Sequence, residues 1–190
     1  MNKLTGESPQ NSALKIGEKA PDFVLETEEG KKWRLSEQFG KVTALLFYPQ
    51  SETLVCTRQM CSVRDNWIKY VETKASIVAI SPGTIIEHRQ FSQHHGLTLP
   101  ILADAGREIT RIYGQHWLMP VQMTRAVVVI DAQGFIRHRQ IMLRAFRPTD
   151  KNVIACIYAA RTDILQEHYK HLLGESKELN EHLRREIDSD

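Results

Sequence analysis

Cys56 is the residue of this sequence best placed to act as a nucleophile. It is one of three cysteines, and it follows an apolar run over residues 42–48 that Pro49 closes. Helical spacing of apolar residues begins at Cys56, so we expect it in the first turn of a helix that follows a buried strand. Free backbone N–H groups and the positive end of the helix dipole would then meet its sulfur. This environment favours the thiolate, the reactive form of cysteine.

Ionisation alone would not make this cysteine an efficient catalyst. A free cysteine is roughly 3% thiolate at neutral pH, so complete ionisation raises its reactivity only about 30-fold. A sulfur that breaks a peroxide O–O bond leaves negative charge on the departing oxygen, so such a site needs hydrogen-bond donors and must exclude water. Thr53, also a candidate N-cap, can place a hydroxyl beside the sulfur, and Pro49 can close the pocket wall. Arg125, just before another buried strand, offers fixed charged donors.

Strands and helices alternate along the chain. Alternating apolar residues predict an N-terminal hairpin over residues 23–35. We expect further strands over residues 42–48, 76–80, 99–102, 126–130 and 135–143, and helices over residues 56–75, 84–95, 106–113 and from Thr149 to Gly174. This order predicts an α/β sandwich with a central mixed β-sheet flanked by helices, in which ligands bind at the carboxyl ends of strands. The segment from Pro49 to Cys56 lies at such an end.

The composition is that of one domain that acts on a small molecule. The chain has 190 residues, 42% of them hydrophobic, and a formal net charge of +2. That balance predicts neither a nucleic-acid nor a membrane partner, and no stretch reaches the roughly 18 apolar residues of a membrane span. We expect a flexible leader over residues 1–14, the domain over residues 15–173 and a polar helical tail over residues 174–190. Residues 1–15 lack the apolar core of a signal peptide, so we expect a soluble, cytoplasmic protein.

The residues around Cys56 carry a family resemblance. The pattern Pro49-x-x-x-Thr53-x-x-Cys56, with Phe47-Tyr48 before it, resembles the active-site motif of the peroxiredoxins. Thr124-Arg125, before a strand that leads into Asp131, is similar to that family too, and residues 15–22 resemble its N-terminal start. The resemblance runs from about residue 16 to about residue 165, with its motifs in the right order.

The resemblance implies a thioredoxin-like fold and a peroxidase that uses no metal or organic cofactor. Its members reduce hydrogen peroxide and alkyl hydroperoxides through a cysteine sulfenic acid, and thioredoxin or a similar dithiol reduces them again. Carried over, Cys56 is the peroxidatic cysteine, and Pro49, Thr53 and Arg125 complete its pocket. Gln59 departs from the pattern, because many members have a glutamate there that orients the arginine. A glutamine can accept a hydrogen bond from Arg125 but supplies no charge, which bears on rate more than on reaction type.

The segment from Cys56 to Cys61 resembles the bacterioferritin comigratory protein, or peroxiredoxin Q, subgroup, in which the second cysteine of this helix resolves the sulfenic acid. In an intact helix, positions five apart are separated by about 7.5 Å along the axis and about 140° around it, beyond the roughly 7 Å Cα limit for a disulfide. We therefore expect oxidation to favour unwinding of the helix start, after which Cys61 forms an intramolecular disulfide with Cys56. Cys156, on a later apolar helix, and an external thiol are the alternatives.

Two other functions fit the same residues. A thiol-disulfide oxidoreductase would share the fold, but such enzymes normally have C-x-x-C at the helix start, whereas Cys56 and Cys61 have four residues between them. A redox-sensing partner protein would use Cys56 only as a switch. The segment beyond Leu173 is the feature of the sequence that is compatible with this function. A monomer and a homodimer are both compatible with the sequence.

His94 and His95 are the one pair of adjacent histidines that could suggest a metal. They stand at the end of a predicted polar helix, where histidine suits the helix dipole. We expect no metal ligand there, because no cysteine or carboxylate with ligand spacing lies nearby in the sequence.

Overall fold

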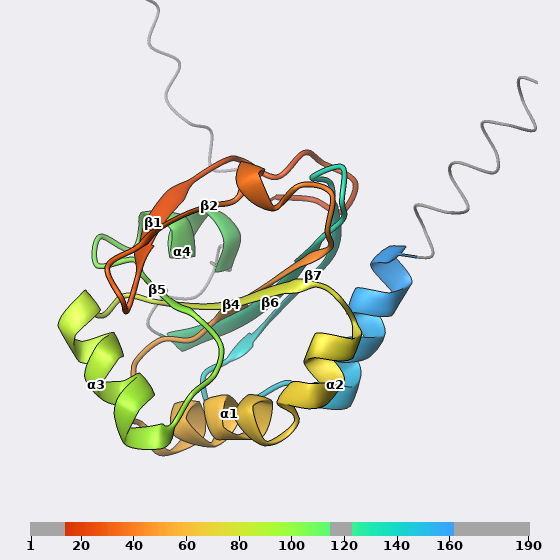
Figure 1. Cartoon of the computed structure of the whole chain (residues 1–190). Coiled ribbons are helices and arrows are strands. Elements are labelled where there is room, and N and C mark those ends of the chain that lie inside the picture. The colour runs from red at the N-terminus through yellow and green to blue at the C-terminus, as the bar shows by residue number, and fades with distance from the viewer. Residues whose placement is uncertain (1–13, 115–122, 162–190) are drawn as a thin grey trace, which may run out of the picture.

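A mixed β-sheet covered by helices forms the centre of the structure (Figure 1). The structure is a computed structural model, and it describes residues 14–114 and 123–161. The sheet has seven strands in the order β2-β1-β5-β4-β3-β6-β7. The predicted tail, and all of the predicted leader except Leu14, lie outside the described residues.

The strands confirm the predicted α/β architecture with its N-terminal hairpin. They are β1 (Val24–Thr27), β2 (Lys32–Arg34), β3 (Thr43–Phe47), β4 (Ser76–Ser81), β5 (Ile101–Ala103), β6 (Thr124–Ile130) and β7 (Ile136–Leu143). Central strand β3 is parallel to β4 and antiparallel to β6, and both β3 and β6 are buried along their whole length, as continuous apolar runs predict. One boundary differs from the prediction. Because β6 begins at Thr124, Arg125 lies inside the strand rather than before it.

The helices follow the predicted order with one correction. They are α1 (Leu54–Asp65), α2 (Trp67–Glu72), α3 (Ile85–His95), α4 (Glu108–Gly114), the 3₁₀ helix η1 (Ser36–Gln38) and a helix over residues 150–161. The prediction of a single helix over residues 56–75 is wrong, because the helix is interrupted at Asn66, between α1 and α2. The Asn66 side-chain amide donates to the Ser62 carbonyl (3.1 Å) and to Asp150 (3.1 Å), and such bonds compete with helix continuation.

Capping residues fix the two ends of α3, which matches the predicted helix over residues 84–95. Thr84 at the N-cap and Glu87 form a capping box, in which each side chain bonds the backbone of the other. Gly96 ends the helix in the left-handed conformation at φ 57°, where a residue with a side chain would be strained. The last turn therefore holds His94 and His95 in defined positions. Among the described helices, none is long and apolar enough to cross a membrane.

The sheet has a hydrophobic core on each face. Helices α1, α2, α3 and the helix over residues 150–161, drawn in blue, cover one face, and α4 covers the other (Figure 1). Alternate residues of β3 divide between the two cores: Ala44 and Leu46 belong to the first, and Leu45 and Phe47 to the second. Cys56 belongs to the first core. Its helix is therefore packed directly against the central strands.

Candidate active site

Cys56 lies at the junction of β3 and α1, and no part of it is exposed to solvent (0%). β3 ends at Phe47, and α1 begins at Leu54 after Thr53 in the N-cap position. The backbone N–H of Thr57 donates to the Thr53 carbonyl (2.8 Å), which places Cys56 in the first turn, as predicted. The N–H groups of a first turn have no partner within the helix, and with the helix dipole they favour negative charge on the sulfur.

Arg125 brings a positive charge to that sulfur from β6. The side chain is buried, with 1% exposed, and all three guanidinium nitrogens donate hydrogen bonds. Nη2 donates to the Cys56 Sγ (2.9 Å), and Nη1 donates to the Gln59 Oε1 (2.5 Å). Nε donates to the backbone carbonyl of Arg144 (3.0 Å), just beyond the end of β7. The arginine is thus held in one orientation, with one donor on the sulfur.

No carboxylate of the described residues forms an ion pair that would balance the charge of Arg125. Gln59 and the Arg144 carbonyl are neutral acceptors. An unpaired buried charge is costly, so the arrangement favours an anion at the position of the Cys56 sulfur.

A cavity of about 290 Å³ opens onto this pair of groups. Its wall contains the four residues that the sequence singled out for a common pocket, namely Pro49, Thr53, Cys56 and Arg125. The remaining lining residues are Gln50, Leu54, Val55, Arg144 and Ala145. The structure therefore brings the predicted pocket residues together around one space large enough for a small molecule.

Thr53 takes the N-cap position without a side-chain capping bond. Its hydroxyl donates to the Gln50 carbonyl (3.4 Å), within the loop that precedes α1. The sequence suggested a hydroxyl beside the sulfur. The side chain does line the cavity, but its hydroxyl hydrogen-bonds the loop instead.

The other two cysteines lie outside this cavity. Cys61 is on α1, half-buried, and Cys156 is half-buried on the helix over residues 150–161, where it packs against the first core. Burial raises the pKa of the Cys156 thiol, which disfavours its thiolate. All three cysteines are free thiols in this structure. Cys56 and Cys61 share one continuous helix, so they are too far apart to form a disulfide without a change of conformation.

Buried His88 supports the loop that precedes α1 through a hydrogen bond to Ser51. It is fully buried on α3, and its Nε2 lies 3.1 Å from the Ser81 carbonyl, which can only accept, so this nitrogen carries the proton. Nδ1 then accepts a hydrogen bond from the Ser51 hydroxyl (3.4 Å), and Ser51 also bonds the Tyr48 hydroxyl (3.2 Å). Burial lowers the pKa of His88, which keeps the ring neutral. Sequence reasoning missed His88. Its position three residues before the apolar Phe91 places the two side chains on the same, inward-facing side of the helix.

A larger cavity of about 480 Å³ adjoins the first, and the two share Pro49, Gln50 and Arg144. Sequence reasoning also missed Arg144 as a part of the site. Its contact with Arg125 is made by the backbone carbonyl, so no side-chain type could have signalled it.

Comparisons with known proteins agree with this geometry. The model of the AhpC/TSA family matches residues 16–139. The chain is 32% identical over 123 residues to a protein named chloroplastic peroxiredoxin Q of Triticum aestivum, an alignment that covers 64% of this chain and 57% of the relative. It is 33% identical over 123 residues to peroxiredoxin Bcp of Bacillus subtilis, covering 65% of this chain and 78% of that protein. The chain thus spans little more than half the length of the plant relative.

The fold has a solved counterpart as well. The crystal structure of peroxidoxin BcpB from Mycobacterium tuberculosis superposes with a TM-score of 0.65 at 27% sequence identity, covering 77% of this chain and 97% of that one. The fold is therefore thioredoxin-like, as the resemblance implies. The family match covers more than half of the chain and includes Cys56, Gln59 and Arg125. The chain therefore belongs to the AhpC/TSA family, that of the peroxiredoxins.

Proposed function

We propose that this protein is a thiol-dependent peroxidase that reduces hydrogen peroxide and organic hydroperoxides, with Cys56 as the attacking residue. One observation carries the proposal: the buried Arg125 guanidinium donates to the Cys56 sulfur at 2.9 Å with no carboxylate partner among the described ion pairs. Such an arrangement favours the thiolate and also provides donors for a bound peroxide. The names of the relatives, peroxiredoxin Q and Bcp, support the same reaction.

The reaction begins when the Cys56 thiolate attacks the terminal oxygen of the peroxide. A new S–O bond forms as the O–O bond breaks, so sulfur is oxidised to sulfenic acid and the departing oxygen is reduced. That oxygen takes up a proton, equivalent to the one the thiol released, and leaves as water or an alcohol. The guanidinium stabilises the negative charge that develops on the departing oxygen.

The neighbouring residues position these groups. Gln59 holds the Nη1 of Arg125, and the Arg144 carbonyl holds its Nε, so the third nitrogen is aimed at the sulfur. Pro49 and Thr53 form the cavity wall around the reacting atoms. Pro49 lacks a backbone N–H and Thr53 is tied to the loop, so this wall is suited to exclude water.

Cys61 then resolves the sulfenic acid. Its thiol attacks the Cys56 sulfur, an S–S bond forms, and the oxygen leaves as water. Both residues lie in α1, so the start of the helix must unwind before the sulfurs meet. A dithiol such as thioredoxin reduces the disulfide by exchange and is itself oxidised.

Stopped-flow measurement of hydrogen peroxide consumption by the reduced protein tests the peroxidase. We expect second-order consumption far faster than that of free cysteine, and its loss in Cys56→Ser. Cys156→Ser is the matched control and should keep the wild-type rate. A wild-type rate near that of free cysteine would leave a thiol-disulfide oxidoreductase or a redox sensor as the better description.

Peptide mapping under non-reducing conditions tests the resolving step. After one equivalent of peroxide, we expect a peptide in which Cys56 is linked to Cys61 within one chain. A dimer linked through Cys156, or a persistent sulfenic acid that only added thiol removes, would refute the assignment of Cys61.

The remaining predictions concern the setting of this reaction. We propose a cytoplasmic protein, a single domain over residues 15–173 and a monomer or homodimer. The family match over residues 16–139 supports the start of that domain. Limited proteolysis tests the boundaries, light scattering tests the assembly, and fractionation of the source cells tests the location, since the Triticum relative is named chloroplastic.

A further inference from the structure

Three side chains with metal-binding atoms meet beside the loop that precedes α1. Glu52 belongs to this loop, and His94 and His95 form the last turn of α3. The Glu52 Oε1 lies 3.2 Å from the His94 Nδ1, and its Oε2 lies 3.1 Å from the His95 Nε2. One ligand atom from each residue lies within 4.8 Å of the others. In the described part of the chain, this is the one such group of three or more.

These distances suit a shared metal ion as well as they suit hydrogen bonds. Nitrogen and oxygen ligands lie about 2.0–2.2 Å from zinc, so two ligands of a tetrahedral site are roughly 3.3 Å apart. Both distances from Glu52 to a histidine nitrogen are within a few tenths of an ångström of that separation. An ion can therefore replace the two hydrogen bonds with little movement of Glu52.

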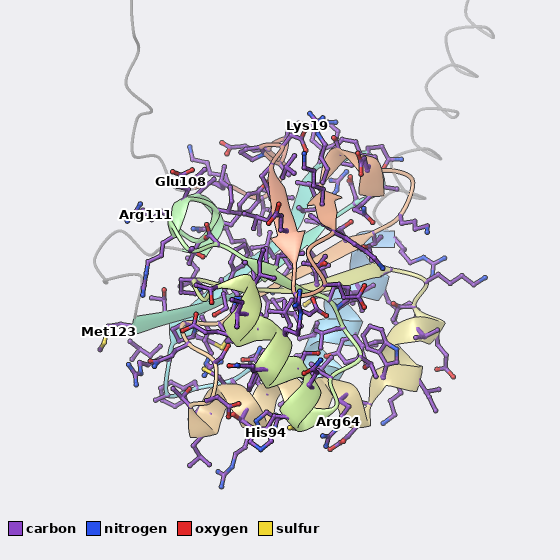
Figure 2. The ribbon with its side chains drawn as sticks, turned by 60° about the vertical axis from the view of Figure 1, so that its left-hand side comes forward. Lys19, Arg64, His94, Glu108, Arg111 and Met123 are labelled. Carbon is purple, nitrogen blue, oxygen red and sulfur yellow. The ribbon has the colours of Figure 1, made fainter. Side chains whose placement is uncertain are left out.

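One of the two histidines is held in place. The His95 side chain is only 18% exposed, and its ring packs edge-on against Phe91 with ring centroids 5.0 Å apart. The His95 carbonyl accepts a hydrogen bond from the Arg64 Nη1 (2.5 Å) on α1, and Figure 2 shows Arg64 close to this end of α3. That arginine is paired with Asp65, which offsets its charge near the group. The His95 ring is thus held in a fixed position.

The other histidine can adjust. The His94 side chain is 70% exposed, and its ring stacks on that of His95 with centroids 4.4 Å apart. An exposed side chain changes rotamer at small cost, so its nitrogen can approach the ion. Two imidazoles and one carboxylate are a ligand set typical of zinc, with a fourth position left for water.

We propose that Glu52, His94 and His95 form a zinc-class metal site that tethers the loop before α1 to the end of α3. The sequence alone singles out His94 and His95 but predicts no metal there, because Glu52 lies 42 residues before His94 and only the fold brings them together. Glu52 directly precedes Thr53, the N-cap of α1. A bound ion therefore stabilises the helix start in its folded form, because it binds that form alone.

Cobalt titration of the reduced full-length protein tests the site, since Co²⁺ substitutes for zinc and has visible absorption. We expect the intense d–d bands of a tetrahedral ion, without a thiolate charge-transfer band, and their loss when zinc is added. Glu52→Gln and His95→Gln should weaken binding at least about tenfold, as loss of a metal ligand requires. His138→Gln, which removes a histidine outside the group, should leave it unchanged.

Two outcomes would overturn the metal site. Absence of d–d bands means that the group is an ion pair only. A thiolate charge-transfer band that survives Glu52→Gln means that cysteines bind the ion instead.

A second measurement tests the tether, and this part rests on the proposed function. After one equivalent of peroxide, zinc should slow formation of the disulfide between Cys56 and Cys61 in the wild type but not in Glu52→Gln. Equal rates with and without zinc in the wild type would overturn the tether. A protein that does not react with peroxide would refute the proposed function instead, while the cobalt spectrum would stand.

Discussion

Arg125 is a large buried cation, and among its described partners only the Cys56 sulfur can carry a charge that balances it. Its partners are the Cys56 sulfur, the Gln59 amide oxygen and a backbone carbonyl, and the last two are neutral. Moving a guanidinium out of water is costly unless an anion or good acceptors compensate. A thiolate at Cys56 and the arginine would therefore stabilise each other, and in the proposed reaction the entering peroxide would meet both.

Arg125→Lys should slow the reaction of the reduced protein with hydrogen peroxide by about 10²–10³-fold, the usual effect of losing one preorganised donor. Lysine keeps the positive charge but lacks the planar fork that bonds the Cys56 sulfur and Gln59 together. The second-order rate constant from stopped-flow competition is the measurement. Arg58→Lys, at an exposed position of the same helix, is the control and should react as the wild type does. Equal rates for Arg125→Lys and wild type would contradict this role.

The pocket residues could be predicted from sequence because each has a local signature. Pro49, Thr53 and Cys56 are fixed by one loop and one helix start, so their spacing alone determines that they lie together. Arg125 comes from a distant strand, and it was predicted from its charge, its place beside a buried apolar run and the Thr124-Arg125 motif. Glu52 and His95 carry no such signature. Their contact depends on where α3 ends relative to the loop, which periodicity does not specify.

At the scale of elements, α1 is held at both of its halves. Arg125 binds the first half through Cys56 and Gln59. Asp150, at the start of the helix over residues 150–161, holds the second half, because it accepts a hydrogen bond from the Ser62 hydroxyl (2.5 Å). It also accepts hydrogen bonds from two residues beyond the end of α1, the Asn66 amide (3.1 Å) and the Tyr70 hydroxyl (2.8 Å). In the proposed reaction, oxidation of Cys56 would change an atom of the first set only. The helix should therefore unwind from its N-terminal end.

Asp150→Ala should lower the free energy of unfolding by about 1–3 kcal/mol, because it leaves the buried Tyr70 hydroxyl and its neighbours without their acceptor. Urea denaturation followed by circular dichroism measures the change. Lys151→Ala, at the exposed next position, is the matched control and should have little effect. Equal stabilities of the two variants would show that the Asp150 bonds do not hold α1.

Hydrogen–deuterium exchange of reduced and disulfide-bonded protein tests the unwinding. Peptides that cover residues 54–61 should exchange faster in the oxidised form, because the disulfide is incompatible with the intact helix. Peptides of the sheet strands β3 and β6 serve as the internal control and should not change. Full retention of protection over α1 in a protein with the Cys56–Cys61 disulfide would contradict the structure's geometry.

Buried His88 should make the protein less stable as the pH falls. Burial lowers its pKa from the ordinary 6.5, so the unfolded chain takes up a proton at a higher pH than the folded chain does. Its contribution to stability is complete above about pH 6.5 and declines below that value, toward the lowered pKa. Urea midpoints measured between about pH 7.5 and pH 5 should fall more steeply in the wild type than in His88→Gln. Burial also lowers the pKa of His138, so this residue adds the same kind of pH dependence to the stability of the wild type and of His88→Gln. If the urea midpoints of the wild type and of His88→Gln fall equally steeply with pH, the contribution assigned to His88 is refuted.

Most elements could be predicted, because strands buried on both faces and capped helices leave strong local patterns. The continuous apolar runs of β3 and β6 indicated the right strands, and α3 matches the predicted helix over residues 84–95. The break between α1 and α2 was not predicted. Apolar spacing continues through Asn66, whereas the break depends on its side-chain bonds, one of which reaches the distant Asp150.

At the scale of the whole molecule, the sheet brings the site together. β3 lies between β4 and β6, and Phe47 at the end of β3 pairs with Ala126, the residue after Arg125. This pairing places the loop before α1 next to the arginine. The sequence predicted a mixed sheet but not its order. In particular β5, parallel to β4 and antiparallel to β1, joins the hairpin to the rest, and such long-range pairing has no local signal.

Chemical trapping of the first oxidised residue tests the assignment of Cys56 most directly. Reduced Cys61→Ser protein, given one equivalent of hydrogen peroxide in the presence of dimedone, should carry the sulfenic acid adduct on Cys56 alone. The replacement removes the resolving thiol, so the sulfenic acid persists long enough to be trapped. Peptide mass spectrometry locates the adduct. An adduct on Cys156 instead, or one divided between these two cysteines, would contradict the assignment of Cys56 and its arginine as the site of attack.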